Sequence, residues 1–303
     1  MLPGEPFVAE VTVPTSERFD RNVRFFGEQG QERIHETSVA VVGLGGLGSH
    51  AVQQLALLGV RRLSLIDSEE LAKTDLNRNV CARADDPIPG SRKTEICERA
   101  ALSIAPEIRV TKVHDTLVSD DAFESIISSD YVFGCLDSDG ARLVLNELCS
   151  AYARPYVDLA TDIPPGERLR YGGRICFAIG FGCLVCLDQI DLDEARRELG
   201  GPEFRRTQEE LYGVGRDLLG EAGPSVVSIN GAIASIAVTE FAVAVSGLRS
   251  PHRVLKYYGH SGKVCVNSDE PHPDCYYCLE IRGKKHEADV ERYIREGVGA
   301  FLR

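Results

Sequence analysis

The sequence predicts an α/β protein with a doubly wound, mostly parallel sheet. Three observations favour this fold class. Short apolar runs alternate with longer stretches of helical spacing through the first half of the chain, the connections between them are short, and the first apolar run ends in glycines. Because parallel strands need a crossover that usually carries a helix, repeated strand–helix units of this kind form a parallel sheet covered by helices.

The strands and helices of this alternation can be placed in chain order. Residues 38–43 read SVAVVG, a β-branched run typical of a buried strand, and residues 49–58 show Ala, Val and Leu at helical spacing. Pro106 ends a later helical pattern because proline has no N–H with which to continue a helix. The further elements are strand 62–67, helix 92–105, strand 108–113, helix 120–128, strand 130–134, helix 140–152 and strand 155–159.

The second half of the chain has a different pattern. After residue 172 come Gly-rich, strand-like segments, and residues 188–221 are dense in charge. We interpret the charged stretch as a long crossover excursion, since such a connection inside a compact domain is commonly functional. A solvated charged face is an equally good interpretation. An apolar helix over 226–248, a strand pair over 253–266 and a polar tail up to residue 303 are expected to follow.

Composition argues against two classes of partner. The 34 Lys and Arg residues against 46 Asp and Glu give a formal net charge of −12, which disfavours a protein that binds nucleic-acid backbones or anionic membranes. The apolar stretch at 226–248 contains Asn230 and Glu240, so we expect a buried helix there and not a membrane span.

The N-terminal segment and the cysteines indicate a compartment. The segment MLPGEPFVAEVTV lacks a basic region followed by an apolar one, so no secretory signal is expected. The ten cysteines are then expected to be thiols or metal ligands and not a disulfide framework. Both observations predict a reducing, cytoplasmic environment.

The glycines after the first strand form a motif. Gly43, Gly45 and Gly48 fit G-x-G-x-x-G between a predicted strand and a predicted helix, and Gly46 stands inside the motif. Glycines here permit a tight turn and let backbone N–H groups at a helix N-terminus approach phosphate oxygens. Asp67 ends the second strand, where a carboxylate can accept hydrogen bonds from ribose hydroxyls. These residues predict a nucleotide site in a Rossmann-like sheet, of either a dinucleotide oxidoreductase or an ATP-using enzyme.

Polar residues after the neighbouring strands separate these two classes. Asp75, Asn77 and Arg78 follow the second strand, Lys93 begins the next helix, and Asp137 follows the fourth strand. The ligand crevice of such sheets lies at the carboxyl ends of the parallel strands, where these residues are expected. Hydride transfer needs no such cluster, whereas phosphoryl or nucleotidyl transfer needs Arg, Lys and a carboxylate-bound Mg²⁺ to neutralise the phosphate. The pattern favours an ATP-using enzyme.

Two Cys-x-x-Cys pairs suggest a metal. Cys183 and Cys186 form the first pair, and Cys275 and Cys278 form the second. Four thiolates in two such pairs suit a tetrahedral Zn²⁺, which is structural when all four ligands are protein sulfur. Reduced thiols without a metal are the alternative. No cysteine lies between residues 188 and 263.

In combination, these motifs resemble the ThiF/MoeB/HesA superfamily, the prokaryotic relatives of ubiquitin-activating enzymes. The family's N-x-x-R element matches at Asp75 and Arg78, with Asp in place of the usual Asn, so the role of Asp75 is left open. The Lys of its G-x-x-K element matches Lys93, and its D-x-x-D-N segment matches at Asp137. The resemblance covers about residues 18–282 and implies adenylation, in which a carboxylate attacks the α-phosphate of ATP and releases pyrophosphate.

The resemblance also implies roles for single residues. The segment Arg18-Phe-Asp-Arg21-Asn is similar to the family's R-Y-x-R-Q, whose second Arg reaches into the partner subunit's active site as an arginine finger. A homodimer is therefore implied. Arg21, Arg78 and Lys93 are expected at the phosphates of ATP, Asp137 at Mg²⁺, and Asp67 at the ribose. The family commonly pairs its two Cys-x-x-Cys segments around Zn²⁺.

The family's usual substrate is the C-terminal carboxylate of a ubiquitin-like or sulfur-carrier protein that ends in Gly-Gly, and we expect this partner. A short peptide or a tRNA base is an alternative acceptor, although the acidic composition disfavours tRNA. An inert structural half of a heterodimeric activating complex is the alternative from a different class. The expected division of the chain is a 1–37 N-terminal arm with the arginine finger, a 38–186 nucleotide-binding core, a 187–225 crossover excursion, a 226–282 C-terminal helix and strands with the second cysteine pair, and a 283–303 tail.

Overall fold

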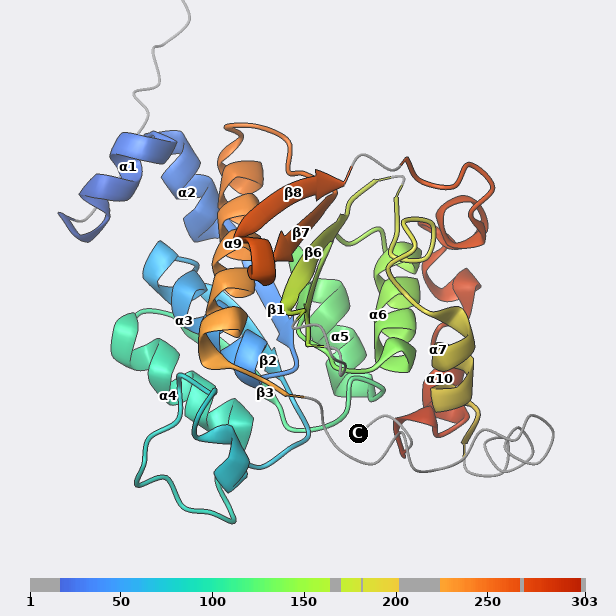
Figure 1. Ribbon diagram of the computed structural model, residues 1–303, viewed down its shortest axis with the longest axis horizontal. Coiled ribbons are helices and arrows are strands. Elements are labelled where there is room, and N and C mark those ends of the chain that lie inside the picture. The colour runs from blue at the N-terminus through green and yellow to red at the C-terminus, as the bar shows by residue number, and fades with distance from the viewer. Residues whose placement is uncertain (1–16, 164–169, 181, 202–223, 268–269, 301–303) are drawn as a thin grey trace, which may run out of the picture.

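The computed structural model describes residues 17–163, 170–180, 182–201, 224–267 and 270–300. In these residues one twisted sheet forms the centre of the molecule, with strand order β3-β2-β1-β4-β5-β6-β7-β8 (Figure 1). Its strands are β1 Ser38–Val42, β2 Arg62–Ile66, β3 Arg109–Val113, β4 Tyr131–Gly134, β5 Tyr156–Asp162, β6 Gly172–Ala178, β7 Val254–Tyr258 and β8 Lys263–Asn267.

The sheet has a parallel part and an antiparallel part. Strands β1 to β5 are parallel, whereas β6, β7 and β8 run antiparallel to their neighbours. The chain moves outward from β1 to β2 and β3 and then returns to place β4 on the other side of β1. Such a reversal of strand order leaves a crevice at the carboxyl ends of the strands, where ligands bind in open α/β sheets. The predicted doubly wound, mostly parallel sheet is confirmed.

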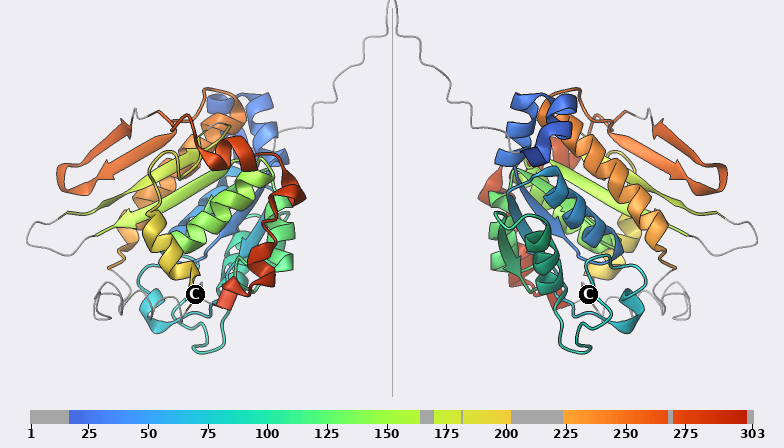
Figure 2. Two further views of the ribbon diagram at one scale, coloured as in Figure 1. Left: turned by 90° about the vertical axis from the view of Figure 1, so that its right-hand side faces the viewer. Right: turned by 90° about the vertical axis from the view of Figure 1, so that its left-hand side faces the viewer.

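Helices cover both faces of the sheet. On one face α2, α3, α4 and α9 enclose one apolar cluster, and on the other α5, α6, α7 and the C-terminal segment enclose a second (Figures 1 and 2). The α-helices are α1 Asp20–Phe26, α2 Glu28–Glu36, α3 Gly46–Leu58, α4 Lys93–Ile104, α5 Asp120–Ser128, α6 Asp139–Ala151, α7 Leu192–Leu199, α9 Val227–Ser246 and α10 Arg292–Arg295. Shorter helical turns are η1 Glu17–Phe19, η2 Lys73–Asp75, η4 Gly259–Ser261, η5 Tyr277–Ile281, η6 Lys285–Ala288 and η7 Val298–Ala300.

Helix α9 is the one described helix whose length and apolar composition would allow it to cross a membrane. Half of its apolar window is buried, and the helix packs against α3, β5 and β6. Asn230 and Glu240 are both buried, and Glu240 forms an ion pair with Arg249. These contacts are those of a core helix, as its polar residues predict.

The chain departs from the sequence expectations near both ends. Residues 17–36 form short helices, of which α2 packs against α9. The expected polar tail, as far as residue 300, folds against α6, and Val290, Tyr293 and Val298 are buried. Arg292 fastens this segment through two contacts with the Glu147 carboxylate, of 2.6 and 2.9 Å. Of the expected crossover excursion, residues 202–223 lie outside the described residues.

Candidate active site

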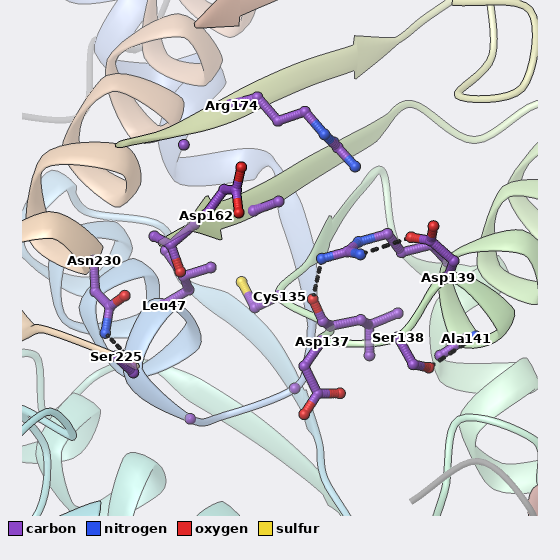
Figure 3. Close-up of a pocket in the computed structure, with 18 of the residues that line it drawn as sticks. Leu47, Cys135, Asp137, Ser138, Asp139, Ala141, Asp162, Arg174, Ser225 and Asn230 are labelled. Atoms are coloured by element: carbon purple, nitrogen blue, oxygen red, sulfur yellow. Dashed lines mark hydrogen bonds and ion pairs between the residues drawn. The ribbon is translucent and has the colours of Figure 1, made fainter. Parts of the chain in front are cut away.

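A cavity of about 1560 Å³ opens at the carboxyl ends of β1, β2 and β4 and extends toward β5, β6 and β7. Figure 3 shows part of its wall, to which α3, α6 and α9 contribute together with the strands. The predicted site residues that line the cavity are Gly43, Gly45, Gly46, Asp67, Asp75, Arg78, Lys93 and Asp137. The structure therefore brings together loops that are far apart in the sequence.

The glycine turn between β1 and α3 is closed by contacts that larger residues would prevent. Gly43 has a φ of +87°, and a Cβ there would lie 2.6 Å from the carbonyl oxygen of Cys135. A Cβ on Gly48 would lie 1.9 Å from the carbonyl oxygen of Gly43. No side chain caps the N-terminus of α3 at Gly45, which leaves N–H groups of the first helical turn available to an anion.

Replacing Gly48 by alanine is expected to lower the stability of the unliganded protein by about 1–3 kcal/mol, because the added methyl group overlaps the Gly43 carbonyl. Gly45→Ala is the matched control, since no described atom lies within 4 Å of a Cβ there and its φ is −74°. Urea unfolding of both variants measures the difference. Equal stability of the two variants would contradict this geometry.

Asp67, at the end of β2, holds the glycine turn in place. Its Oδ2 accepts a hydrogen bond of 2.6 Å from the backbone N–H of Leu44, and its Oδ1 accepts one of 2.8 Å from Glu69. Burial raises the pKa of Asp67, and the nearby Lys93 opposes this shift. A carboxylate has about four acceptor positions, so Asp67 can also accept a hydrogen bond from a ribose hydroxyl.

Lys93 and Arg78 present positive charge on the same wall. Lys93 is buried at the start of α4, forms an ion pair with Glu69 and lies 3.6 Å from Asp75 Oδ2. Burial opposes its charge, but the carboxylates of Asp67 and Glu69 more than compensate and raise the pKa of Lys93. Arg78 Nη2 lies 2.7 Å from Asp75 Oδ1. The two cations are thus fixed around one buried carboxylate.

Asp75 is the residue that holds these cations. Its side chain is 5% exposed, and its Oδ2 also accepts a hydrogen bond of 3.0 Å from the backbone N–H of Ala72. The negative charge that the sequence places beside the expected phosphates is therefore offset by Arg78 and Lys93. Asp75 therefore lies between the two cations in the structure, and its contact with a nucleotide stays a prediction.

Asp137 follows β4 and is an exposed carboxylate of the cavity wall. Within the part of the chain that the structure describes, its side chain has no hydrogen-bond or ion-pair partner. Figure 3 shows the Asp137 carboxylate pointing away from Asp139. Mg²⁺ in sites that hold substrate phosphates is usually bound by one or two carboxylates of this kind.

Three predicted site residues do not line the cavity. Asn77 is exposed and outside the cavity lining, whereas Asn79 is buried and donates a hydrogen bond of 3.0 Å to the carbonyl oxygen of Leu44. A ligand contact at Asn77 stays a prediction. Gly48 lies beneath the turn. Arg21 is exposed on α1, which Figure 1 shows beside α2 and away from the loops that follow β1 and β2. Its role as an arginine finger stays a prediction.

Sequence reasoning missed several polar residues of the site. Arg142, Arg174 and Asn230 line the cavity, and Asp158 is fully buried behind it on β5. A Cβ on Gly46 would lie 2.2 Å from Asn230 Nδ2. Asn230, on α9, therefore packs directly against the glycine turn. A lone polar residue within an apolar strand or helix was the available signal for Asp158 and Asn230, because buried polar groups require partners.

The four cysteines of the two pairs form one buried cluster, with all four sulfurs within 4.8 Å of one another. Cys183 Sγ lies 3.6 Å from Cys275 Sγ, and Cys186 Sγ lies 3.7 Å from Cys278 Sγ. In a tetrahedral site with zinc–sulfur bonds of about 2.3 Å, the sulfurs are about 3.8 Å apart. The cluster therefore fits zinc, and it joins the chain after β6 to Cys275 and to Cys278 in the first turn of η5.

Fold and site together define a Rossmann-like α/β protein with a glycine turn and an uncapped helix N-terminus at the reversal of its strand order. The chain belongs to the ThiF family, whose model matches residues 19–278. The predicted membership of the ThiF/MoeB/HesA superfamily is confirmed.

Among curated proteins, the chain is similar to the heterocyst protein HesA of Trichormus variabilis, with 33% identity over 148 residues, which is 48% of this chain and 55% of that protein. It is 31% identical over 188 residues to the molybdopterin-synthase adenylyltransferase of Escherichia coli, covering 60% of this chain and 72% of that protein. It is also 36% identical over 153 residues to the adenylyltransferase and sulfurtransferase MOCS3 of Drosophila willistoni, covering 50% of this chain and 31% of that protein. The chain thus spans about half the length of the HesA proteins it matches.

Among solved structures, the chain resembles E. coli MccB crystallised with AMPCPP and MccA, with a TM-score of 0.68. The match covers 88% of this chain and 75% of MccB at 18% sequence identity, and it concerns the fold.

Proposed function

We propose that the protein is an ATP-dependent adenylyltransferase that activates a carboxylate as an acyl-AMP. The observation that carries the proposal is one cavity that combines the glycine turn, the cations Lys93 and Arg78, and the Asp137 carboxylate, which has no partner among the described residues. A nicotinamide enzyme would have no use for these charges. The names of the E. coli and Drosophila relatives, both adenylyltransferases, support the same activity.

In the proposed reaction a carboxylate oxygen of the substrate attacks the α-phosphorus of ATP. A bond forms between them, the bond from the α-phosphorus to the oxygen bridging to the β-phosphate breaks, and pyrophosphate leaves with that electron pair. The attacking carboxylate is already ionised at neutral pH, so the step needs no general base. Lys93 and Arg78 neutralise charge on the phosphates, while Asp67 accepts a hydrogen bond from the ribose. A Mg²⁺ ion held by Asp137 would supply further neutralisation of the phosphate oxygens.

The proposed substrate is the C-terminal carboxylate of a ubiquitin-like or sulfur-carrier protein that ends in Gly-Gly. The cavity supports this because it continues from the glycine turn to β6 and β7, giving an extended chain end room beside the nucleotide. We also propose a homodimer in which Arg21 of the partner subunit reaches the phosphates, and a structural Zn²⁺ on the four cysteines. A cytoplasmic location would keep these thiols reduced.

ATP–pyrophosphate exchange tests the proposal directly. We expect the purified protein to exchange labelled pyrophosphate into ATP only when a Gly-Gly-ending partner is present, because exchange requires reversal of acyl-AMP formation. The same partner without its last glycine is the control and is expected to support no exchange. Exchange that persists with the truncated partner would exclude this acceptor. Absence of exchange with every such partner, despite ATP binding, would favour the inert half of a heterodimer.

A further inference from the structure

The loop that carries Asp137 is fixed on both sides by one arginine. Arg142, in the first turns of α6, donates a hydrogen bond of 2.6 Å from Nη2 to the carbonyl oxygen of Leu136. Its Nη1 lies 2.9 Å from Asp139 Oδ1. Leu136 and Asp139 stand immediately before and two residues after Asp137, so a single planar guanidinium brackets that residue.

Arg142 is in turn held by a buried acid. Asp158 on β5 is fully buried, and its Oδ1 lies 3.5 Å from Arg142 Nε. The same oxygen accepts a hydrogen bond of 2.9 Å from the hydroxyl of Tyr156, and Arg174 pairs with the other oxygen. Asp158 thus meets a partner on each oxygen. Arg142 Nη1 and Nη2 donate hydrogen bonds to Asp139 and to the Leu136 carbonyl, whereas the buried Nε has no hydrogen-bond partner among the described residues and faces Asp158 at ion-pair distance. Arg142 has one well-defined orientation.

The Asp137 side chain itself lacks such support. It is exposed and has no hydrogen-bond or ion-pair partner among the described residues, so no such contact there fixes the carboxylate. Its position is determined by the backbone between Leu136 and Asp139. Functional carboxylates must be held within about 0.5 Å of the productive geometry, usually by neighbours that do not touch the ligand.

We propose that Arg142, oriented by Asp158, is a positioning residue that holds the backbone of Asp137 so that its carboxylate can bind the metal ion of the nucleotide. The inference rests on the proposed function, since it assumes a metal–nucleotide complex in the cavity. Arg142 does not touch the ligand in this role. Its removal is expected to weaken the response of nucleotide binding to Mg²⁺ while leaving metal-free nucleotide binding nearly unchanged.

A purely structural role for Arg142 would give a different result. Loss of a buried ion pair destabilises a protein. If Arg142 had only this structural role, its loss would change nucleotide affinity by the same factor with and without Mg²⁺. The chain offers a matched control for this effect on the same helix. Arg292 pairs with Glu147 of α6 in two contacts on the side of the C-terminal segment, and neither residue lines the cavity.

Calorimetric titration with α,β-methylene-ATP, with and without Mg²⁺, tests the proposal without requiring turnover. We expect Mg²⁺ to strengthen binding to the unmodified protein and to the Arg292→Gln variant by the same factor. In Arg142→Gln that factor is expected to fall at least tenfold, as in Asp137→Asn. Arg142→Lys keeps the positive charge beside Asp158 and is therefore expected to fold. Its single ammonium group cannot contact both Leu136 and Asp139 as the guanidinium does, so the Mg²⁺ factor should fall in this variant as well.

The outcomes separate the two proposals. If Mg²⁺ fails to strengthen binding to the unmodified protein, the proposed metal-dependent nucleotide site is wrong. If Mg²⁺ strengthens binding and the factor is unchanged in both Arg142 variants, the proposed function stands and the positioning role is wrong. Thermal unfolding of each variant confirms that the protein is folded during the titration. A folded Arg142→Lys with a reduced factor supports the proposal even where Arg142→Gln does not fold.

Discussion

Replacing Asp137 by asparagine is expected to reduce ATP–pyrophosphate exchange at least a hundredfold while the protein keeps its stability. The carboxylate is exposed and has no partner among the described residues, so the folded chain loses no internal contact. In the proposed reaction the same carboxylate holds the metal ion that neutralises the reacting phosphates. Removal of one such stabilising group costs about 10²–10³ in rate in other enzymes. Exchange assays give the rate, and thermal unfolding gives the stability.

The control for this substitution is Asp121→Asn. Asp121 is likewise an exposed aspartate, in the first turn of α5, and it does not line the cavity. Both variants are expected to unfold within about 0.5 kcal/mol of the unmodified protein, as exposed substitutions usually do. Full exchange activity in Asp137→Asn would remove this residue from the proposed machinery. A large loss in Asp121→Asn would show that the assay responds to something other than the site.

Most of the fold could be predicted because its signals are local. The β-branched run before Gly43 and the helical spacing after it are readable within one short window, and β1 and α3 were found there. The segment 283–300 could not be predicted in this way. Its helices are three or four residues long, too short for periodicity, and it folds because Tyr293 and Arg292 meet Glu147 of α6.

The site was predictable where residue type alone carries the chemistry. Asp137 follows a predicted parallel strand directly and Lys93 begins the helix after another, and parallel strands bring their carboxyl ends together. The sequence could not show which of Asn77 and Asn79 has its side chain buried. This depends on the turn that η2 (Lys73–Asp75) makes before them, and in the structure Asn79 is the one that hydrogen-bonds to Leu44. Arg142 carries no motif signal, since its importance comes from the nearness of the Leu136 carbonyl and Asp158 in three dimensions.

Loss of the proposed zinc is expected to have the largest effect on stability. The four-cysteine cluster joins two segments, of which the first is also held to α6, where Asn146 accepts a hydrogen bond of 2.9 Å from the N–H of Leu184. Binding of a structural Zn²⁺ contributes on the order of 10 kcal/mol in small zinc domains, and part of that energy would be lost with any one ligand. We expect Cys275→Ser to lower stability by more than about 3 kcal/mol.

The control is Cys265→Ser, because Cys265 is an exposed thiol on β8 outside the cluster. Zinc content measured by mass spectrometry should be one ion per chain in the unmodified protein and in this control, and should fall in Cys275→Ser. Hydrogen exchange should then rise in the segment from Cys275 to Val298, which the cluster anchors, and much less in β1 and β4. The cause is that the parallel strands have their own packed core on both faces. Unchanged hydrogen exchange in that segment of Cys275→Ser would contradict a structural zinc. So would an unmodified protein that purifies without zinc and is as stable as one that contains it.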